Sequence, residues 1–126
     1  MAYLLDTDVL IDFLRGRAEA AAFLDSLIEP PFISVITVAE LYAGVREGAE
    51  RAALQQLISA ANVLPLDEAV ATAGGLWRRQ YGRSHNVGLN DALIAATAEN
   101  CQATLATLNV KHFPMLATVL SPYQKP

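Results

Sequence analysis

The sequence is short of cysteine, of positive charge and of long apolar runs, and each shortage excludes a class of protein. Its single cysteine, Cys101, cannot form an intrachain disulfide or a multi-cysteine zinc site, and no basic segment followed by an apolar stretch opens the chain. The longest apolar region, residues 32–45, is interrupted by Glu40 and is shorter than the roughly twenty residues that a membrane-spanning helix needs. We therefore expect a cytoplasmic protein that does not enter the membrane.

Positive charge is scarce, because nine Lys and Arg residues are outnumbered by thirteen Asp and Glu residues and the formal net charge is −4. Proteins that hold nucleic acid by bulk electrostatics need an excess of basic side chains. Any contact with nucleic acid must therefore be local and assisted by a metal ion, or must come from an oligomer that pools its basic residues. The 126 residues, 53% of them hydrophobic, suit a single domain over 1–126 whose order ends at about residue 121, just before Pro122.

Apolar patterning predicts strands that alternate with helices along the chain. Strands are predicted at 2–5, 32–35, 62–66 and 103–107, and the segment 115–120 can hold a fifth. Helices are predicted at 9–14, 18–28, 37–45, 49–61, 68–81 and 91–100, with a polar loop at 82–88. This alternation is typical of an α/β fold with a mostly parallel sheet and helices on both faces, in which ligands bind outside the carboxyl ends of the strands.

Asp6 directly follows the first predicted strand, in the segment YLLDTDVLID, and so falls at the ligand-binding edge of such a sheet. Burial of an ionised carboxylate is costly unless it is paired, hydrogen-bonded or bound to a metal ion. Asp6 can be an ordinary helix cap, but Thr7 and Asp8 can also cap and the helix needs only one. We interpret Asp6 as a metal ligand, and Asp8 mainly as a cap with a supporting role at the same site.

Glu40 allows two interpretations. It stands three residues after Thr37, the spacing of a capping box, in which each side chain bonds the backbone amide of the other residue. If the helix instead begins near Ser34, Glu40 lies inside an apolar helix face, where an unpaired carboxylate is costly and a cation relieves the cost. Asp91 is similarly open, because it begins the apolar helix DALIAATA, where the helix dipole alone favours an acid.

Thr107 and Asn109 follow the fourth predicted strand and reach the same edge of the sheet, although Asn109 also suits a turn. Together with Asp6, Glu40 and Asp91, Asn109 lies at a strand end or helix start that a parallel sheet brings to one place. Clustered carboxylates repel one another unless a cation lies between them. Oxygen ligands without clustered Cys or His select a hard ion, Mg²⁺ or Mn²⁺.

Four segments occur in order along nearly the whole chain: LDTDVLIDFLRG, ISVITVAELYAGV, LNDALIAATA and LATLNVKHF. Together they resemble the PIN-domain ribonucleases of the VapC toxin type. The resemblance implies a three-layer α/β/α sandwich with a mostly parallel sheet, Mg²⁺-dependent endoribonuclease activity, a homodimer, and inhibition by a co-encoded VapB-like antitoxin. By position, Asp6, Glu40 and Asp91 match the metal-binding acids of the family. Asn109 falls at its fourth acidic position, and Thr107 matches a hydroxyl residue common beside it.

Basic side chains are expected to steer the RNA backbone toward these acids. The candidates are Arg15, Arg46, Arg83 and Lys111, although each of them, like His112, also suits solvated surface. Exposed apolar residues of the helices within 9–28 and 41–57 can form a groove for an amphipathic segment of the antitoxin, with one of its Arg side chains entering the acidic site. Alternatively, those apolar residues all belong to the core.

Two rival functions remain open at this point. A strand followed by Asp-x-Asp also begins haloacid-dehalogenase-like phosphatases, in which the first Asp is a nucleophile. The Gly-Thr pair expected after it is missing here, as is a Lys before a Gly-Asp-x-x-x-Asp element. The other rival is a binding module of the same fold, whose acids are only caps or whose Asn109 leaves it unable to hold a catalytic metal ion.

Overall fold

The computed structural model describes residues 2–124, which form five strands, six α-helices and one short 3₁₀ helix. The strands are β1 (Tyr3–Leu5), β2 (Phe32–Ser34), β3 (Asn62–Leu64), β4 (Thr104–Ala106) and β5 (Val119–Leu120). The helices are α1 (Thr7–Leu14), α2 (Ala18–Asp25), α3 (Val35–Gly44), α4 (Ala49–Ala60), α5 (Glu68–Tyr81), α6 (Leu89–Asn100) and the 3₁₀ helix η1 (Val110–His112). None of these helices is long and apolar enough to cross a membrane.

The strands form one parallel sheet in the order β3-β2-β1-β4-β5. From β1 the chain proceeds outward through β2 to β3, and it then returns to place β4 on the other side of β1. The direction of winding therefore reverses between β1 and β4. Such a switch point leaves a crevice at the carboxyl ends of the two neighbouring strands, where ligands of α/β proteins bind.

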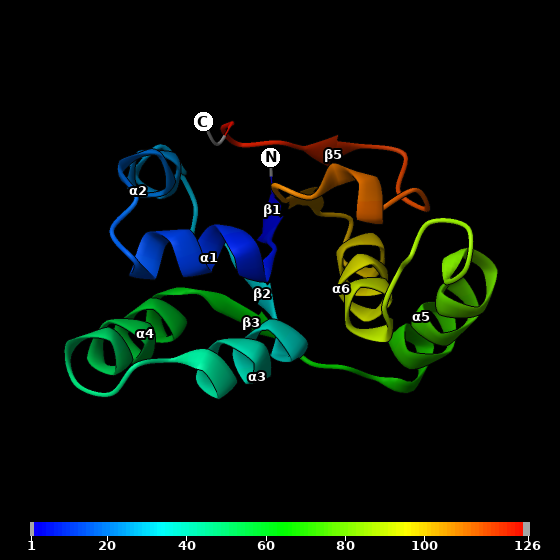
Figure 1. Cartoon of the computed structure of the whole chain (residues 1–126), viewed down its shortest axis with the longest axis horizontal. Coiled ribbons are helices and arrows are strands. Elements are labelled where there is room, and N and C mark those ends of the chain that lie inside the picture. Colours follow the sequence, from blue (N-terminus) through cyan, green and yellow to red (C-terminus); the bar gives the residue numbers. More distant parts are fainter. Residues whose placement is uncertain (1, 125–126) are drawn as a thin grey trace.

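Helices cover both faces of this sheet, with α1 to α4 on one side and α5 and α6 on the other (Figure 1). Successive side chains of a strand point to opposite faces. Leu4 and Leu105 accordingly pack with Ile94 of α6, whereas Leu5 packs with Leu10 of α1, and all five are fully buried. The predicted three-layer α/β/α sandwich with its parallel sheet is confirmed.

Two helices begin earlier than predicted, because the residue that ends the preceding strand or directly follows it caps the helix. α1 begins at Thr7, after Asp6 as N-cap, and Asp6 Oδ1 accepts a hydrogen bond from the Thr7 amide at 2.8 Å. α3 begins at Val35, after Ser34 as N-cap, whose hydroxyl accepts from the Ile36 amide at 3.0 Å. The prediction that Val35 belongs to the second strand is therefore wrong.

A third helix, α6, also begins early. It starts at Leu89 with Gly88 in the N-cap position, two residues before the predicted start at residue 91. The Asn90 amide donates a hydrogen bond to Oε2 of Glu40 at 3.3 Å. By contrast, α5 spans residues 68–81 as predicted, with Asp67 as its N-cap.

The segment after β5 is held against α1. The Tyr123 hydroxyl donates to Oδ2 of Asp12 at 2.8 Å, and Asp12 also forms an ion pair with Arg17 at 3.5 Å. The described structure thus continues to residue 124, beyond the expected end of order at about residue 121.

The contact between α5 and α6 depends on Gly74. A β-carbon at this position would lie 2.6 Å from Cδ2 and 3.1 Å from Cα of the buried Leu93. We expect Gly74→Ala to push the helices apart and to lower the free energy of unfolding by about 1–3 kcal/mol. Gly75→Ala is the matched control, because a β-carbon there meets nothing within 4 Å and alanine favours a helix by up to about 1 kcal/mol. Urea denaturation measures both, and an equal gain in the two variants would contradict the packing argument.

Candidate active site at the carboxyl edge of the sheet

Asp6 and Thr107 face each other across the switch point of the sheet. Asp6 follows β1, Thr107 follows β4, and the Thr107 hydroxyl donates a hydrogen bond to Oδ2 of Asp6 at 2.7 Å. The pairing of β1 with β4 continues one step further, because the Asp6 amide donates to the Ala106 carbonyl at 2.9 Å. Both side chains are buried. The carboxylate of Asp6 thus has a fixed orientation at the edge where the sequence predicts a ligand.

Asp8 ties the start of α1 to the segment after β4. Its Oδ1 accepts from the Val9 amide at 2.7 Å, and its Oδ2 accepts from the Leu108 amide at 3.1 Å and lies 3.3 Å from the Thr107 hydroxyl. The N-cap of α1 is Asp6, so the prediction that Asp8 holds that position is wrong. Asp8 instead supports the pair formed by Asp6 and Thr107.

Glu40 lies inside α3, because this helix begins at Val35, and the capping-box interpretation with Thr37 is therefore wrong. The Thr7 hydroxyl donates to Oε1 of Glu40 at 2.6 Å and lies 3.1 Å from Oγ1 of Thr37. Asn90 of α6 donates to the other carboxylate oxygen. Residues of helices α1 and α6 thus orient the Glu40 carboxylate. Of the two interpretations of Glu40, the one that places it inside a helix remains.

Asp91 lies in the first turn of α6, and its Oδ2 is 3.3 Å from Nδ1 of His112 in η1. The Asn109 side-chain nitrogen is 2.8 Å from the same imidazole nitrogen. His112 therefore stands between Asn109 and Asp91, and it remains partly exposed at the surface, as expected. In the sequence, the spacing of Asn109 and His112 was the signal for their contact, because residues three apart lie on the same side of one helical turn.

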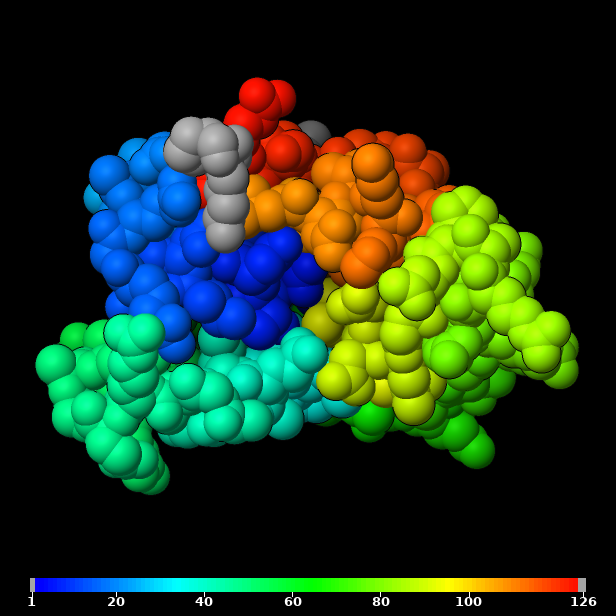
Figure 2. All heavy atoms as spheres, in the orientation of Figure 1, coloured from blue at the N-terminus to red at the C-terminus, as the bar shows by residue number. Residues whose placement is uncertain are grey.

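The starts of three helices meet the segment after β4 at the centre of one face of the molecule. Figure 2 shows this as the convergence of α1 in blue, α3 in cyan and α6 in yellow with the orange residues that follow β4. Asp6 directly precedes α1, Asp91 lies in the first turn of α6, and Glu40 lies further inside α3. Residues far apart in the sequence thus gather at the carboxyl edge of the sheet.

Burial raises the pKa of Asp6 to about 7. The neighbouring charge of Asp8 adds to this increase, and Asp91 contributes a smaller part. The hydrogen bonds from Thr107 and Thr7 act in the opposite direction and lower the pKa of Asp6. The charged form of the Asp6 carboxyl is therefore disfavoured, and a positive charge beside it would stabilise that form.

Burial is also the main cause that raises the pKa of Asp91. His112 lowers this pKa through its hydrogen bond and charge, and the carboxylate of Glu40 raises it. Asp91 is therefore close enough to repel both Asp6 and Glu40. Across residues 2–124, however, no three His, Cys, Asp or Glu side chains are arranged closely enough to hold a metal ion as they stand.

The four predicted basic residues divide into two pairs on different sides of these acids. Arg15 forms an ion pair with Glu50 at 3.1 Å and lines a small hollow of about 80 Å³ together with Glu40. The Arg46 amide donates to the same Glu50 carboxylate at 3.1 Å. Arg83 and Lys111 instead line one cleft beside His112.

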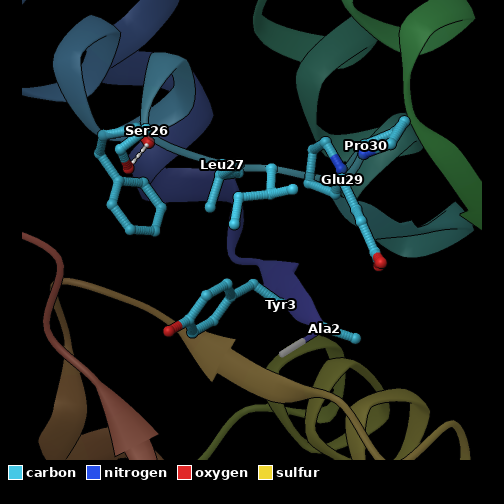
Figure 3. Close-up of a pocket in the computed structure, with 9 residues that line it drawn as sticks. Ala2, Tyr3, Ser26, Leu27, Glu29 and Pro30 are labelled. Atoms are coloured by element: carbon cyan, nitrogen blue, oxygen red, sulfur yellow. Dashed lines mark hydrogen bonds between the residues drawn. The ribbon is translucent and has the colours of Figure 1, made fainter.

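A further hollow of about 330 Å³ lies among Ala2, Tyr3, Leu27 and Pro30 (Figure 3). It adjoins the amino ends of β1 and β2, and the strands are parallel, so it lies at the edge of the sheet opposite the acids. Its wall includes the chain after α2. This helix ends at Asp25, before the predicted end at residue 28, and beyond it the Ser26 hydroxyl donates back to the Phe23 carbonyl at 2.6 Å.

The PIN domain family matches residues 3–115 of the sequence. The chain belongs to the PIN-domain family. It is 45% identical over 126 residues to Ribonuclease VapC10 of Mycobacterium tuberculosis. The alignment covers 98% of this chain and 94% of that protein. The chain is 43% identical over 125 residues to Ribonuclease VapC19 of the same organism, covering 95% of this chain and 98% of that one. The solved "Toxin-antitoxin complex from Klebsiella pneumoniae" contains a chain that is 29% identical, with a TM-score of 0.85 over 98% of this chain and 100% of that chain.

The resemblance to VapC-type PIN domains that rests on four sequence segments is thereby confirmed. The matched residues include every acid of the candidate site as well as Thr107, Asn109 and His112. Membership of this PIN-domain family favours the nuclease over the haloacid-dehalogenase-like phosphatase. It does not by itself separate an active nuclease from a binding module of the same fold.

Asp6→Asn should change how the stability of the metal-free PIN domain depends on pH. The pKa of Asp6 rises from its ordinary value of 3.8 to about 7 on folding, so between these values the folded state holds a proton that the unfolded state has lost. The free energy of unfolding of the wild type should therefore fall as the pH rises from 3.8 to about 7, by at most about 1.4 kcal/mol per pH unit. Asp91, whose pKa is also raised, contributes in the same direction.

The Asn variant lacks the titration of Asp6, so its stability should fall less over this interval and exceed that of the wild type at neutral pH. An asparagine oxygen can still accept the hydrogen bond from the Thr7 amide. Urea denaturation in EDTA at several pH values measures both proteins. Parallel profiles would show that the pKa of Asp6 is not raised.

Proposed function

We propose that this PIN domain is an endoribonuclease that hydrolyses RNA with a divalent cation held by Asp6, Glu40 and Asp91. The observation that carries this proposal is the gathering of three acids near the switch point of the sheet, where burial, with a smaller contribution from neighbouring carboxylates, raises the pKa of Asp6 and Asp91. The similarity to two proteins named as ribonucleases supports RNA as the substrate.

The donor set fits Mg²⁺, with Mn²⁺ as an alternative, because it consists of carboxylate oxygens. Glu40 and Asp91 are partly exposed and can turn toward the buried Asp6, and their mutual repulsion favours a cation over an empty site. A bound Mg²⁺ would lower the pKa of a water molecule and neutralise charge on the phosphodiester oxygens.

The surrounding residues orient the acids. Thr107 and the Thr7 amide hold the two oxygens of Asp6, and the Thr7 hydroxyl holds Glu40. His112 positions Asp91 when its Nδ1 carries the proton, and the Asn109 side chain lies beside the same nitrogen. In this proposal His112 and Asn109 are positioning residues, and the fourth family position contributes no carboxylate to the cation.

RNA cleavage should require Mg²⁺ and the three acids. We expect EDTA, Asp6→Asn, Glu40→Gln and Asp91→Asn each to lower cleavage of a labelled RNA by more than about 100-fold, because each removes the cation or one of its ligands. His112→Ala should lower cleavage by about 10- to 100-fold and weaken Mn²⁺ binding measured by calorimetry, because it removes the imidazole that orients the Asp91 carboxylate.

Asp25→Asn is the matched control, since this exposed acid lies at the end of α2, and it should cleave like the wild type. Cleavage that persists in the three site variants would identify a contaminating nuclease. A wild type that binds RNA but does not cleave it with Mg²⁺ or Mn²⁺ would favour the binding module.

The chain is further proposed to act in the cytoplasm as the toxin of a toxin–antitoxin pair. The similar chain from Klebsiella pneumoniae was solved in such a complex, and here α1 and α3 form a hollow that contains Ile11, Leu14 and Leu41 next to Glu40. Ile11 remains 40% exposed. An apolar segment of a VapB-like antitoxin can cover this surface while one of its Arg side chains pairs with Glu40. The homodimer implied by the resemblance stays a prediction.

The product of a short reading frame beside the gene should bind at this hollow. We expect Ile11→Asp to weaken its binding by about tenfold or more, because a charge would replace an apolar contact at the interface. Leu76→Asp is the control, since Leu76 is similarly exposed but lies on α5, on the other side of the sheet. Isothermal titration calorimetry measures both variants, and equal binding by them would place the antitoxin elsewhere.

A further inference from the structure

A basic cleft borders the acids on the side of α6. It lies between residues 83–86, which follow α5, and residues 110–114, which follow β4, and its volume is about 610 Å³. In Figure 2 these two segments appear in yellow-green and orange, side by side. Arg83, His85, Lys111 and His112 all line this cleft, and among the described residues none of its lining is Asp or Glu.

The charge of this cleft is opposite to that of the whole chain, which has nine Lys and Arg residues against thirteen Asp and Glu residues. Several of the other arginines are neutralised, because Arg15, Arg17 and Arg51 form ion pairs with neighbouring acids. Within residues 2–124, neither Arg83 nor Lys111 takes part in an ion pair, and both are exposed. Two free cationic side chains thus remain available to an anionic ligand.

The cleft opens onto the acids through a shared residue. His112 lines the cleft, and its Nδ1 also lies 3.3 Å from Oδ2 of Asp91. A chain of phosphates that contacts Arg83 and Lys111 would therefore lie next to Asp91, on one side of the proposed cation site. A small anion could occupy the cleft, but only a polymer would use both the cleft and the acids.

The loop that forms one wall of the cleft has a defined shape. The His85 amide donates to the Tyr81 carbonyl at 3.0 Å, and the His85 ring makes an edge contact with the Tyr81 ring, with centroids 5.5 Å apart. Asn86 adopts a left-handed conformation with φ of 53°, after which Val87 is buried. The loop is thus anchored at both ends, which reduces the entropy lost when it binds a ligand.

We propose that this cleft binds the backbone of single-stranded RNA and guides it into the carboxylate site. The guanidinium of Arg83 and the ammonium of Lys111 contact phosphates, and the apolar lining of Val110 and Pro114 receives bases. A single strand fits this arrangement because its bases are free to turn toward the protein, whereas those of a duplex are stacked and paired. The proposal rests on the proposed nuclease function, of which it names the substrate-binding surface.

The test measures binding and cleavage separately with Arg83→Ala, Lys111→Ala and the double variant. Binding of a fluorescent single-stranded RNA is followed by anisotropy in EDTA at several salt concentrations, so that no cleavage occurs. We expect the double variant to raise Kd roughly tenfold or more and to reduce the slope of log K against log salt by about 0.7 for each lost phosphate contact. Arg51→Ala is the matched control, because Arg51 is exposed and paired with Glu47 on the far side of the sheet, and it should bind like the wild type.

The outcomes separate this proposal from the nuclease proposal. In one outcome, the wild type cleaves RNA with Mg²⁺ while the double variant binds RNA as tightly as Arg51→Ala does. This result would contradict RNA binding at the cleft but would support the nuclease proposal. A wild type that does not cleave RNA, but whose binding depends on Arg83 and Lys111, would support the cleft and overturn the nuclease. Tighter binding of duplex RNA or of an acidic peptide than of the single strand would also overturn the proposal.

Discussion

Burial of the Asp6 carboxylate beside other acids is the constraint on which the rest of the site depends. Burial makes the charged form of Asp6 costly, the charges of Asp8 and Asp91 add to this cost, and nothing in the packing of the sheet requires an acid at this place. A hydrogen bond from the Thr7 hydroxyl orients Glu40, and one from the Thr107 hydroxyl orients Asp6. A stability cost that is maintained by dedicated contacts is typical of a functional site.

The fold explains why Asp6, Glu40 and Asp91 meet although more than thirty residues separate each from the next along the chain. The parallel sheet brings the carboxyl ends of β1 and β4 together at the point where its winding reverses. Helices that begin at this edge then project their first residues into the same crevice. The same arrangement creates two different flanks, an apolar hollow between α1 and α3 and a basic cleft beside α6. A protein inhibitor and an RNA strand can thus approach the acids from different sides.

Much of this could be predicted from the sequence, because apolar periodicity and the change from apolar to acidic at Leu5 and Asp6 are local signals. Helix starts were harder, since Ser34 and Thr37 are both favoured N-cap residues near the start of α3, and Gly88 caps α6 although Asn90 is the more favoured type. In α3 this choice decided between the two interpretations of Glu40. The apolar pattern of the first turn is shared by strand and helix, so only the tertiary structure distinguishes them.

The contact of His112 with Asp91 could not be predicted in the same way. It joins residues 21 positions apart, and the direction of an imidazole in a short 3₁₀ helix is set by the path of the chain after β4 and not by local propensity. Arg83 and Lys111 were predicted as two of four basic candidates, but their meeting in one cleft could not be predicted, since Arg83 follows α5 and Lys111 lies in η1. A net negative charge of −4 gives no indication that basic side chains are concentrated at one place.

Anomalous diffraction from crystals of the protein soaked with Mn²⁺ locates the cation without reference to activity. We expect one strong peak within coordination distance of carboxylate oxygens from Asp6, Glu40 and Asp91. A well-diffracting crystal with no peak at this position, or with Mn²⁺ bound only elsewhere, would contradict the proposed cation site.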